Sequence, residues 1–122
     1  MLERNIQNKI RLKLTGKGIF FRANVGRGWV GDVISRSNGK VTLKNARSFT
    51  TGLPAGFSDL FGIRPVKITP DMVGQTIGVF TAIEVKTPKG KLSKYQSHFL
   101  KQIEANGGKT IVARCAEDVE GL

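Results

Sequence analysis

Two strand-like segments that flank a single helical segment constrain the fold of this chain more than any other feature. The first strand covers residues 80–86 and the second, TIVARC, covers residues 110–115. Between them, residues 93–108 (SKYQSHFLKQIEANGG) have the pattern of one helix. Because a strand, a helix and a further strand in succession form a crossover, the two strands are expected to be parallel. The second strand is apolar and needs cover on both faces.

The expected helix has recognisable ends. Ser93 is a candidate N-cap, and the glycines at 107–108 end the helix. His98, the single histidine of the chain, falls on the exposed flank, so we expect it to be solvated and not catalytic. Three apolar residues are expected to form the buried face: Phe99, Leu100 and Ile103.

The N-terminal half predicts one helix followed by antiparallel strands. Residues 2–14 carry a four-residue apolar repeat, which predicts an amphipathic helix with a basic outer face and a buried stripe of Leu2, Ile6, Ile10 and Leu14. A strand is expected over 19–25, and a hairpin over 29–36 and 40–49 that turns at Asn38-Gly39. A loop, a short strand over 58–63 and a turn at 69–71 follow. The order α-β-β-β-α-β predicts one α/β domain, residues 1–122, with a mixed sheet flanked by helices.

The composition indicates a globular protein of the cytoplasm. The 122 residues are 39% hydrophobic and 24% charged, and we expect no membrane span and no signal peptide. Cys115 is the single cysteine, so no internal disulfide is possible, which fits a reducing compartment. Since Cys115 ends the apolar stretch TIVARC, we expect it to be buried and unreactive.

The positive charge of the chain predicts a polyanionic partner. The net charge is +11; residues 1–51 hold eleven Lys and Arg against two acids, and residues 52–122 hold nine against seven. Nucleic acid is therefore the expected partner, bound mainly by the first half of the chain. The candidate contacts are Lys9, Lys13, Arg22 and Arg27. Trp29 and Tyr95 could stack on unpaired bases, although Trp29 at the start of a hairpin strand also suits simple packing.

Glu84 and Lys86 stand two positions apart in the expected strand and therefore project from the same face. Asp59 lies at the start of the preceding strand, so two carboxylates and one lysine are expected at a shared sheet edge. Such a group suits Mg²⁺ or Mn²⁺, which would neutralise a scissile phosphate and activate water for in-line attack. The alternative is a surface ion pair between Glu84 and Lys86, worth about 0–1 kcal/mol.

These residues resemble a known family. Asp59 with Glu84-x-Lys86 matches the PD-(D/E)XK nuclease signature, and the wider sequence resembles the virus-type replication-repair nuclease (VRR-NUC) domain of small stand-alone phage proteins. The shared elements are ExxIQxxIRxxL, RANVG, LPAGFSDL, AIEVKTPKGKLSxxQ, GG and VARCAED. Ser58 departs from the pattern, where the family has proline. The resemblance implies a restriction-endonuclease-like core.

The resemblance also implies roles for particular residues. Asp59 and Glu84 would ligate the metal with the carbonyl of Val85, and Lys86 would be the catalytic lysine. Glu3 matches an acid on the first helix that faces the metal in relatives. The alternative for Glu3 is an acid that interacts with the helix dipole.

Gln96 has two competing interpretations. Ser93-x-x-Gln96 has the pattern of a capping box, which would fully explain the glutamine. The family instead places a glutamine beside the catalytic lysine, and we favour this active-site role.

The function expected from the resemblance is a Mg²⁺- or Mn²⁺-dependent endonuclease that acts as a homodimer on branched DNA, for example four-way (Holliday) junctions. The alternatives are a non-catalytic nucleic-acid-binding protein and a nuclease that acts on flaps, linear DNA or RNA. The expected dimer surface is the hairpin of residues 29–49 with the loop GLPAGF, because the hairpin carries many apolar residues. The alternative is that these residues close the monomer's own sheet.

Overall fold

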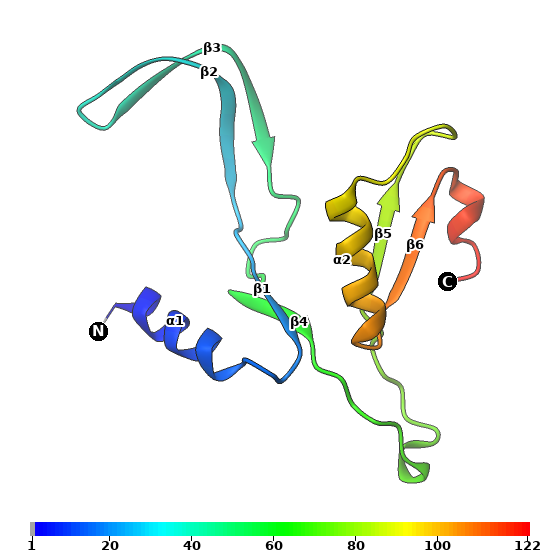
Figure 1. The fold of residues 1–122 in the computed structure, drawn as a ribbon. Coiled ribbons are helices and arrows are strands. Elements are labelled where there is room, and N and C mark those ends of the chain that lie inside the picture. Colours follow the sequence, from blue (N-terminus) through cyan, green and yellow to red (C-terminus); the bar gives the residue numbers. More distant parts are fainter. Residues whose placement is uncertain (1) are drawn as a thin grey trace. The chain divides into compact units, whose positions relative to one another are not determined.

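The computed structural model describes residues 2–122, which contain two helices, six strands and two short 3-10 helices (Figure 1). In chain order they are α1 (Glu3–Lys13), β1 (Ile19–Arg22), β2 (Arg27–Ser37), β3 (Lys40–Thr50), β4 (Leu60–Ile63), η1 (Pro70–Met72), β5 (Thr81–Val85), α2 (Lys94–Ala105), β6 (Lys109–Ala113) and η2 (Ala116–Val119). The chain divides into two compact units, Phe21–Phe61 and the remainder, and the division falls within β1 and β4.

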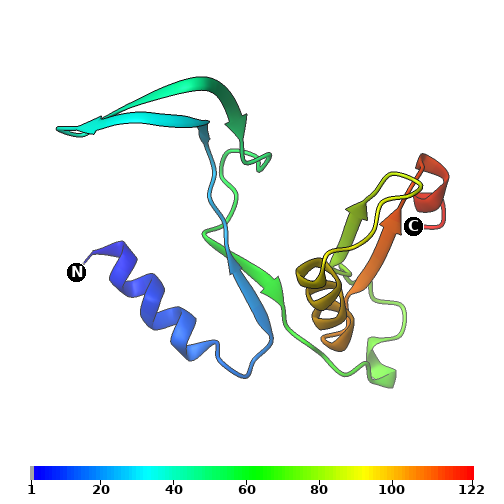
Figure 2. The ribbon, with the colours of Figure 1, turned by 45° about the horizontal axis from the view of Figure 1, so that its top comes forward.

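The crossover predicted from the C-terminal half is present. β5 and β6 pair in parallel, from Thr81 opposite Lys109 to Val85 opposite Ala113, and α2 connects them along one face (Figures 1 and 2). The core of this unit lies where α2 meets the strands. Leu100 and Ile103 of α2 and Ala113 of β6 are buried there, and Ile63, at the end of β4, is the other buried apolar residue of the described chain.

Local sequence explains both ends of α2. The hydroxyl of Ser93 accepts a hydrogen bond from the backbone N–H of Gln96, and the side-chain oxygen of Gln96 accepts one from the N–H of Ser93. At the other end Gly107 has a φ of 89°, a conformation that glycine adopts without a steric penalty. The helix therefore starts and stops where the sequence predicts.

The hairpin β2–β3 lies entirely within the unit Phe21–Phe61. Asn38 and Gly39 both have positive φ, as a two-residue type I′ turn requires, and Ser37 pairs with Lys40 across the turn. Register shifts between Val30 and Asp32 and again between Val33 and Ser35 interrupt the ladder. Irregularities of this kind bend a strand, and the hairpin is visibly curved in Figures 1 and 2.

The strands β1 and β4 also form a ladder of their own. The residues described thus contain three two-stranded sheets: the β1–β4 ladder, the antiparallel hairpin β2–β3 and the parallel pair β5–β6. The predicted α/β class, with strands of both orientations and two helices in the predicted order, is confirmed. No helix in residues 2–122 is long and apolar enough to cross a membrane.

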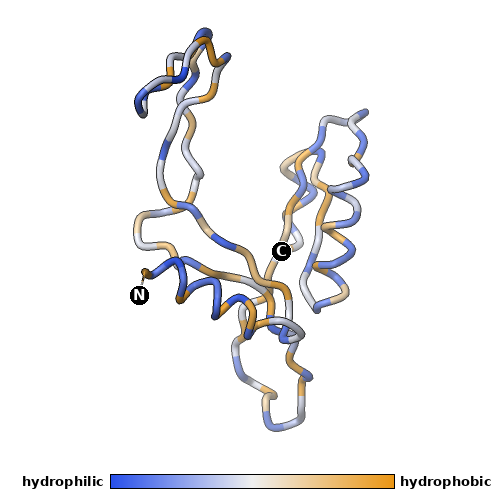
Figure 3. Tube along the Cα trace, turned by 60° about the vertical axis from the view of Figure 1, so that its left-hand side comes forward, coloured by the Kyte–Doolittle hydropathy of each residue, from blue (hydrophilic) through white to orange (hydrophobic). Residues whose placement is uncertain are grey.

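Three burial predictions are wrong. Helix α1 has the predicted length and alternates hydrophilic and hydrophobic segments (Figure 3), but none of its residues is buried. A four-residue repeat fixes which side chains share a face, whereas burial depends on what packs against that face. Phe99 on α2 is 40% exposed, unlike Leu100 and Ile103.

Cys115 is the third wrong prediction, because it is exposed. The strand β6 ends at Ala113, before the cysteine. One carboxylate oxygen of Asp118 accepts hydrogen bonds from the backbone N–H groups of Arg114 (2.7 Å) and Cys115 (3.3 Å). These bonds turn the backbone into η2 and carry Cys115 out of the strand.

Candidate active site

The strand β5 places Glu84 and Lys86 on the face that α2 covers. Exposure alternates along the strand: Ala82, Glu84 and Lys86 are half-buried, whereas Ile83 and Val85 are exposed. The charged face of the strand therefore lies under the helix, and the apolar face is the more open one. This is an unusual choice of face for a carboxylate and an ammonium group with no role beyond solubility.

Glu84 and Lys86 form a partly buried ion pair. The Nζ of Lys86 lies 3.7 Å from Oε1 of Glu84, and the two side chains are 20% and 28% exposed, respectively. The predicted proximity of the two charges is confirmed. The ion pair by itself fits a metal-dependent active site and also a simple surface ion pair. The residues around the pair are therefore needed to separate these two interpretations.

Gln96 joins this pair from α2. Its side-chain Nε2 donates a hydrogen bond of 2.9 Å to Oε1 of Glu84. The backbone N–H of Ser93 can only donate, so the Gln96 atom 2.9 Å away from it must be the amide oxygen. This capping bond fixes the orientation of the amide and directs its NH₂ group to Glu84. The capping box is thus confirmed, and the same amide also contacts Glu84, while the active-site role of Gln96 stays a prediction.

The oxygen atoms of Glu84 are used unequally. Oε1 accepts the hydrogen bond from Gln96 and forms the ion pair with Lys86, whereas Oε2 has no hydrogen-bond partner among the residues described. A carboxylate held on one oxygen and open on the other can ligate a cation. Carboxylate and peptide carbonyl oxygens are the ligands that Mg²⁺ and Mn²⁺ prefer. The chemistry of Glu84 therefore fits a divalent cation.

The carbonyl of Val85 is also available. In the parallel ladder, the N–H of Lys86 donates to the carbonyl of Ala113, and the N–H of Lys109 donates to the carbonyl of Phe80. The residues whose backbone groups bond to a given neighbouring strand alternate along β5. The backbone N–H and C=O groups of the even-numbered residues point to β6, so the carbonyl of Val85 points to the opposite edge of the strand. Within residues 2–122 no strand pairs with that edge.

Asp59 and Glu3 are placed by other elements. Asp59 directly precedes β4 in the unit Phe21–Phe61, and its carbonyl accepts a hydrogen bond of 2.9 Å from the N–H of Ala23. Rings of Phe57 and Phe61 pack edge-on beside it, with centroids 5.3 Å apart. Glu3 is exposed in the first turn of α1. The convergence of Asp59, Glu84 and Glu3 on one metal stays a prediction.

The candidate nucleic-acid contacts are accessible. The side chains of Lys9 and Lys13 on α1, Arg22 on β1 and Arg27 on β2 are exposed. The exposed fractions of the two aromatic candidates are 68% for Trp29 and 87% for Tyr95. His98 is exposed, as predicted, and its ring contacts the amide of Gln102 on the next turn of α2. Contact of these residues with DNA stays a prediction.

Arg114 is the residue near the site that the sequence patterns did not single out. It follows β6 directly, and its Nη1 donates to three carbonyl oxygens of the turn after Lys86. Asp118 holds its backbone, and the hydrogen bond from the N–H of Arg114 lowers the pKa of Asp118 below its ordinary value. The parallel register, in which Val85 pairs with Ala113, brings Arg114 beside the end of β5, and no local sequence pattern indicates this contact.

Comparison with known protein families gives one match. The VRR-NUC domain model matches residues 30–117, which include Asp59, Glu84, Lys86 and Gln96. No curated protein and no solved structure matches the chain. Nucleases with the PD-(D/E)XK signature generally use divalent metals. With 30–117 of 122 residues matched, the chain belongs to the VRR-NUC domain family and is a nuclease of the PD-(D/E)XK type that acts on DNA.

Proposed function

We propose that this nuclease is a Mg²⁺- or Mn²⁺-dependent endonuclease that cuts branched DNA, with four-way junctions as its substrate, and that it works as a homodimer. The observation that carries the metal-dependent cleavage is the hydrogen bond from Gln96 to the same oxygen of Glu84 that pairs with Lys86. The arrangement leaves the second oxygen of Glu84 for a ligand and keeps an ammonium group beside it. A purely structural ion pair requires neither feature.

The proposed metal ligands are the carboxylates of Asp59, Glu84 and Glu3 and the carbonyl of Val85. A divalent cation supplies charge stabilisation for the phosphate and an activated water in this type of reaction. The protein's part is to hold the Glu84 carboxylate in one orientation, which the amide of Gln96 does. Glu84 and its amide partner belong to different elements, β5 and α2, so the packing of that pair of elements sets the geometry.

Lys86 is proposed as the catalytic lysine. Its ammonium group lies beside the carboxylate, on the same strand face, where it can orient the attacking water or stabilise the negative charge that develops on the phosphate. A non-catalytic DNA-binding protein would not need Lys86 and Gln96 both in contact with Glu84. This contact is the reason to prefer catalysis over binding alone.

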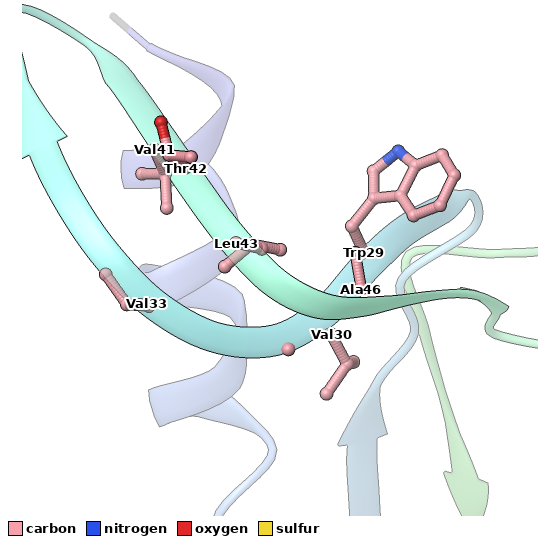
Figure 4. A pocket seen from close by; sticks show the side chains of 8 residues that line it. Trp29, Val30, Val33, Val41, Thr42, Leu43 and Ala46 are labelled. Atoms are coloured by element: carbon pink, nitrogen blue, oxygen red, sulfur yellow. The ribbon is translucent and has the colours of Figure 1, made fainter.

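Assembly as a homodimer is proposed from the hairpin β2–β3. A two-stranded hairpin is marginally stable in water by itself and needs a packed face. A shallow apolar concavity lies on the hairpin and is lined by Trp29, Val30, Gly31, Val33, Val41, Thr42, Leu43 and Ala46 (Figure 4). Two copies related by a two-fold axis would cover this surface and present two active sites to a symmetric junction. The competing account is that the monomer covers its own hairpin.

The test is a panel of labelled linear, flap and four-way-junction DNAs, incubated with and without Mg²⁺ or Mn²⁺. The expected result is metal-dependent cleavage that is fastest on the junction, with Glu84→Gln as the inactive control. Light scattering at micromolar concentration, on the wild type and on a Trp29→Ser variant, tests the assembly. A strict monomer that cuts linear duplex as readily as a junction would contradict the dimer and the junction preference together.

A further inference from the structure

The guanidinium group of Arg114 donates hydrogen bonds to three backbone carbonyls. Its Nη1 lies 2.6 Å from the carbonyl oxygen of Thr87, 2.7 Å from that of Gly90 and 3.3 Å from that of Pro88. One guanidinium nitrogen carries two N–H bonds. The two short contacts therefore use both donors, and the contact with Pro88 is the weaker, shared one.

These carbonyls belong to a tight turn that starts immediately after Lys86. The N–H of Gly90 donates to the carbonyl of Thr87 at 3.0 Å, which closes a four-residue turn with Pro88 at its second position. Carbonyl dipoles that converge on one point repel each other unless a cation lies there. Arg114 provides that cation, so it stabilises the turn in a way that the single backbone hydrogen bond does not.

The same residue is tied to Lys86 through the sheet. The N–H of Lys86 donates to the carbonyl of Ala113, the residue before Arg114, at 2.9 Å. Arg114 is itself anchored, because a carboxylate oxygen of Asp118 accepts its backbone N–H at 2.7 Å. Lys86 is thus held by β6 through its own N–H, and by the Arg114 side chain through the turn that follows it.

We propose that Arg114 is a positioning residue for the reaction: by fixing the turn Thr87–Gly90, its guanidinium group sets the direction in which Lys86 leaves the strand and keeps its ammonium beside Glu84. This inference rests on the proposed catalytic role of Lys86. It predicts that Arg114 affects the catalytic rate and not the affinity for DNA. A small displacement of a catalytic group can slow a reaction strongly: a shift of about 1 Å can lower the rate by about a hundredfold.

The test compares Arg114→Met, which keeps the apolar part of the side chain, with Arg114→Lys and with Lys109→Met. Lys109 is an exposed residue at the start of β6, the strand that Arg114 follows, and its side chain makes no hydrogen bond or ion pair in the described chain, so it controls for the loss of one positive charge. We expect Arg114→Met to lower kcat on the order of ten- to a hundredfold with KM nearly unchanged. Arg114→Lys should fall between, because lysine keeps a charged donor but its side chain is one atom shorter, so its ammonium group reaches the carbonyls of the turn less well.

Two further readouts separate positioning from a general loss of stability. Free guanidinium ion at millimolar concentration should restore part of the kcat of Arg114→Ala and leave Lys109→Ala unchanged. Amide hydrogen exchange at Gly90 should accelerate in Arg114→Met and not in Lys109→Met. A wild-type kcat in Arg114→Met, or a defect confined to KM and its salt dependence, would overturn the inference. A wild-type protein that cleaves no DNA would instead overturn the proposed function.

Discussion

The amide of Gln96 connects two tasks, because its oxygen caps the start of α2 at Ser93 while its nitrogen donates a 2.9 Å hydrogen bond to Glu84. The cap is a local interaction over three residues, and the bond to Glu84 joins the helix to the strand that carries Glu84, the partner of Lys86. The start of α2 and the orientation of the Glu84 carboxylate are therefore fixed by the same side chain.

Gln96→Glu should separate these two tasks. A glutamate keeps an oxygen that accepts from the N–H of Ser93, but it removes the donor and places a second carboxylate against Glu84. A hydrogen bond to a charged group is worth about 1.5–3 kcal/mol, so we expect cleavage to slow by about tenfold or more. Ser93→Ala is the matched control, with about 1 kcal/mol less stability and an unchanged rate. Cleavage rates and thermal unfolding of both variants check this, and the reverse pattern would contradict it.

Lys86→Ala should abolish most turnover and leave metal binding intact. The proposed role of Lys86 is to act on water or on the developing charge of the phosphate, and the loss of a group with such a role costs about 10²- to 10⁴-fold in rate. Lys67→Ala removes the same charge at an exposed loop position and should cleave normally. Single-turnover cleavage with a parallel metal titration measures both effects. Near-normal cleavage by Lys86→Ala would mean that the pair with Glu84 is only a surface ion pair.

Neutralising Lys9, Lys13, Arg22 or Arg27 should weaken DNA binding by a similar factor for every DNA sequence. Interactions with phosphate carry no base information, and the removal of one of them should reduce the salt slope of binding by about 1. Binding titrations at several salt concentrations check this. Neutralisation of Lys89, Lys91, Lys94 or Lys101 is the comparison, and a much larger effect there would move the binding surface to the second half of the chain.

The sequence predicted the parts of this fold that depend on neighbouring residues. Ser93 and Gln96 predicted the start of α2, and Asn38 with Gly39 predicted the hairpin turn, because caps and turns are decided within about four residues. Burial of α1 and Cys115 was predicted wrongly, since burial depends on distant partners. For Cys115 the deciding residue is Asp118, whose carboxylate redirects the backbone after β6.

The candidate site also has features that neighbouring residues determine and features that depend on distant partners. The proximity of Glu84 and Lys86 follows from strand alternation, and the capping bond of Gln96 follows from its spacing to Ser93, whereas its bond to Glu84 depends on how α2 packs against β5. The three hydrogen bonds of Arg114 to carbonyls were not expected, because no local pattern marks an arginine that bonds a turn 24 to 27 residues earlier. Only the parallel register of β5 and β6 brings that turn and Arg114 together.

Asp118 should make stability depend on pH in the acid range. Its pKa is lowered mainly by the hydrogen bond from the backbone N–H of Arg114, so the folded pKa lies below the unfolded value of about 3.9. A lowered folded pKa means stability that is present above the unfolded pKa and is lost as pH falls through the folded one. Urea unfolding from about pH 7 down to about pH 3 should show Asp118→Asn less stable than wild type, with the difference shrinking towards acid. A constant difference would contradict this.

The most direct test of the metal-dependent nuclease is cleavage of a labelled four-way junction by the wild type, Glu84→Gln and Asp59→Asn, each with Mg²⁺, with Mn²⁺ and with excess chelator. Both substitutions keep the shape of the side chain and remove a charged ligand oxygen. The account predicts cleavage only by the wild type with a divalent cation, while both variants bind the junction as tightly as the wild type or slightly more tightly, since a negative charge leaves a phosphate site. Wild-type turnover in excess chelator, or normal turnover by either variant, would contradict it.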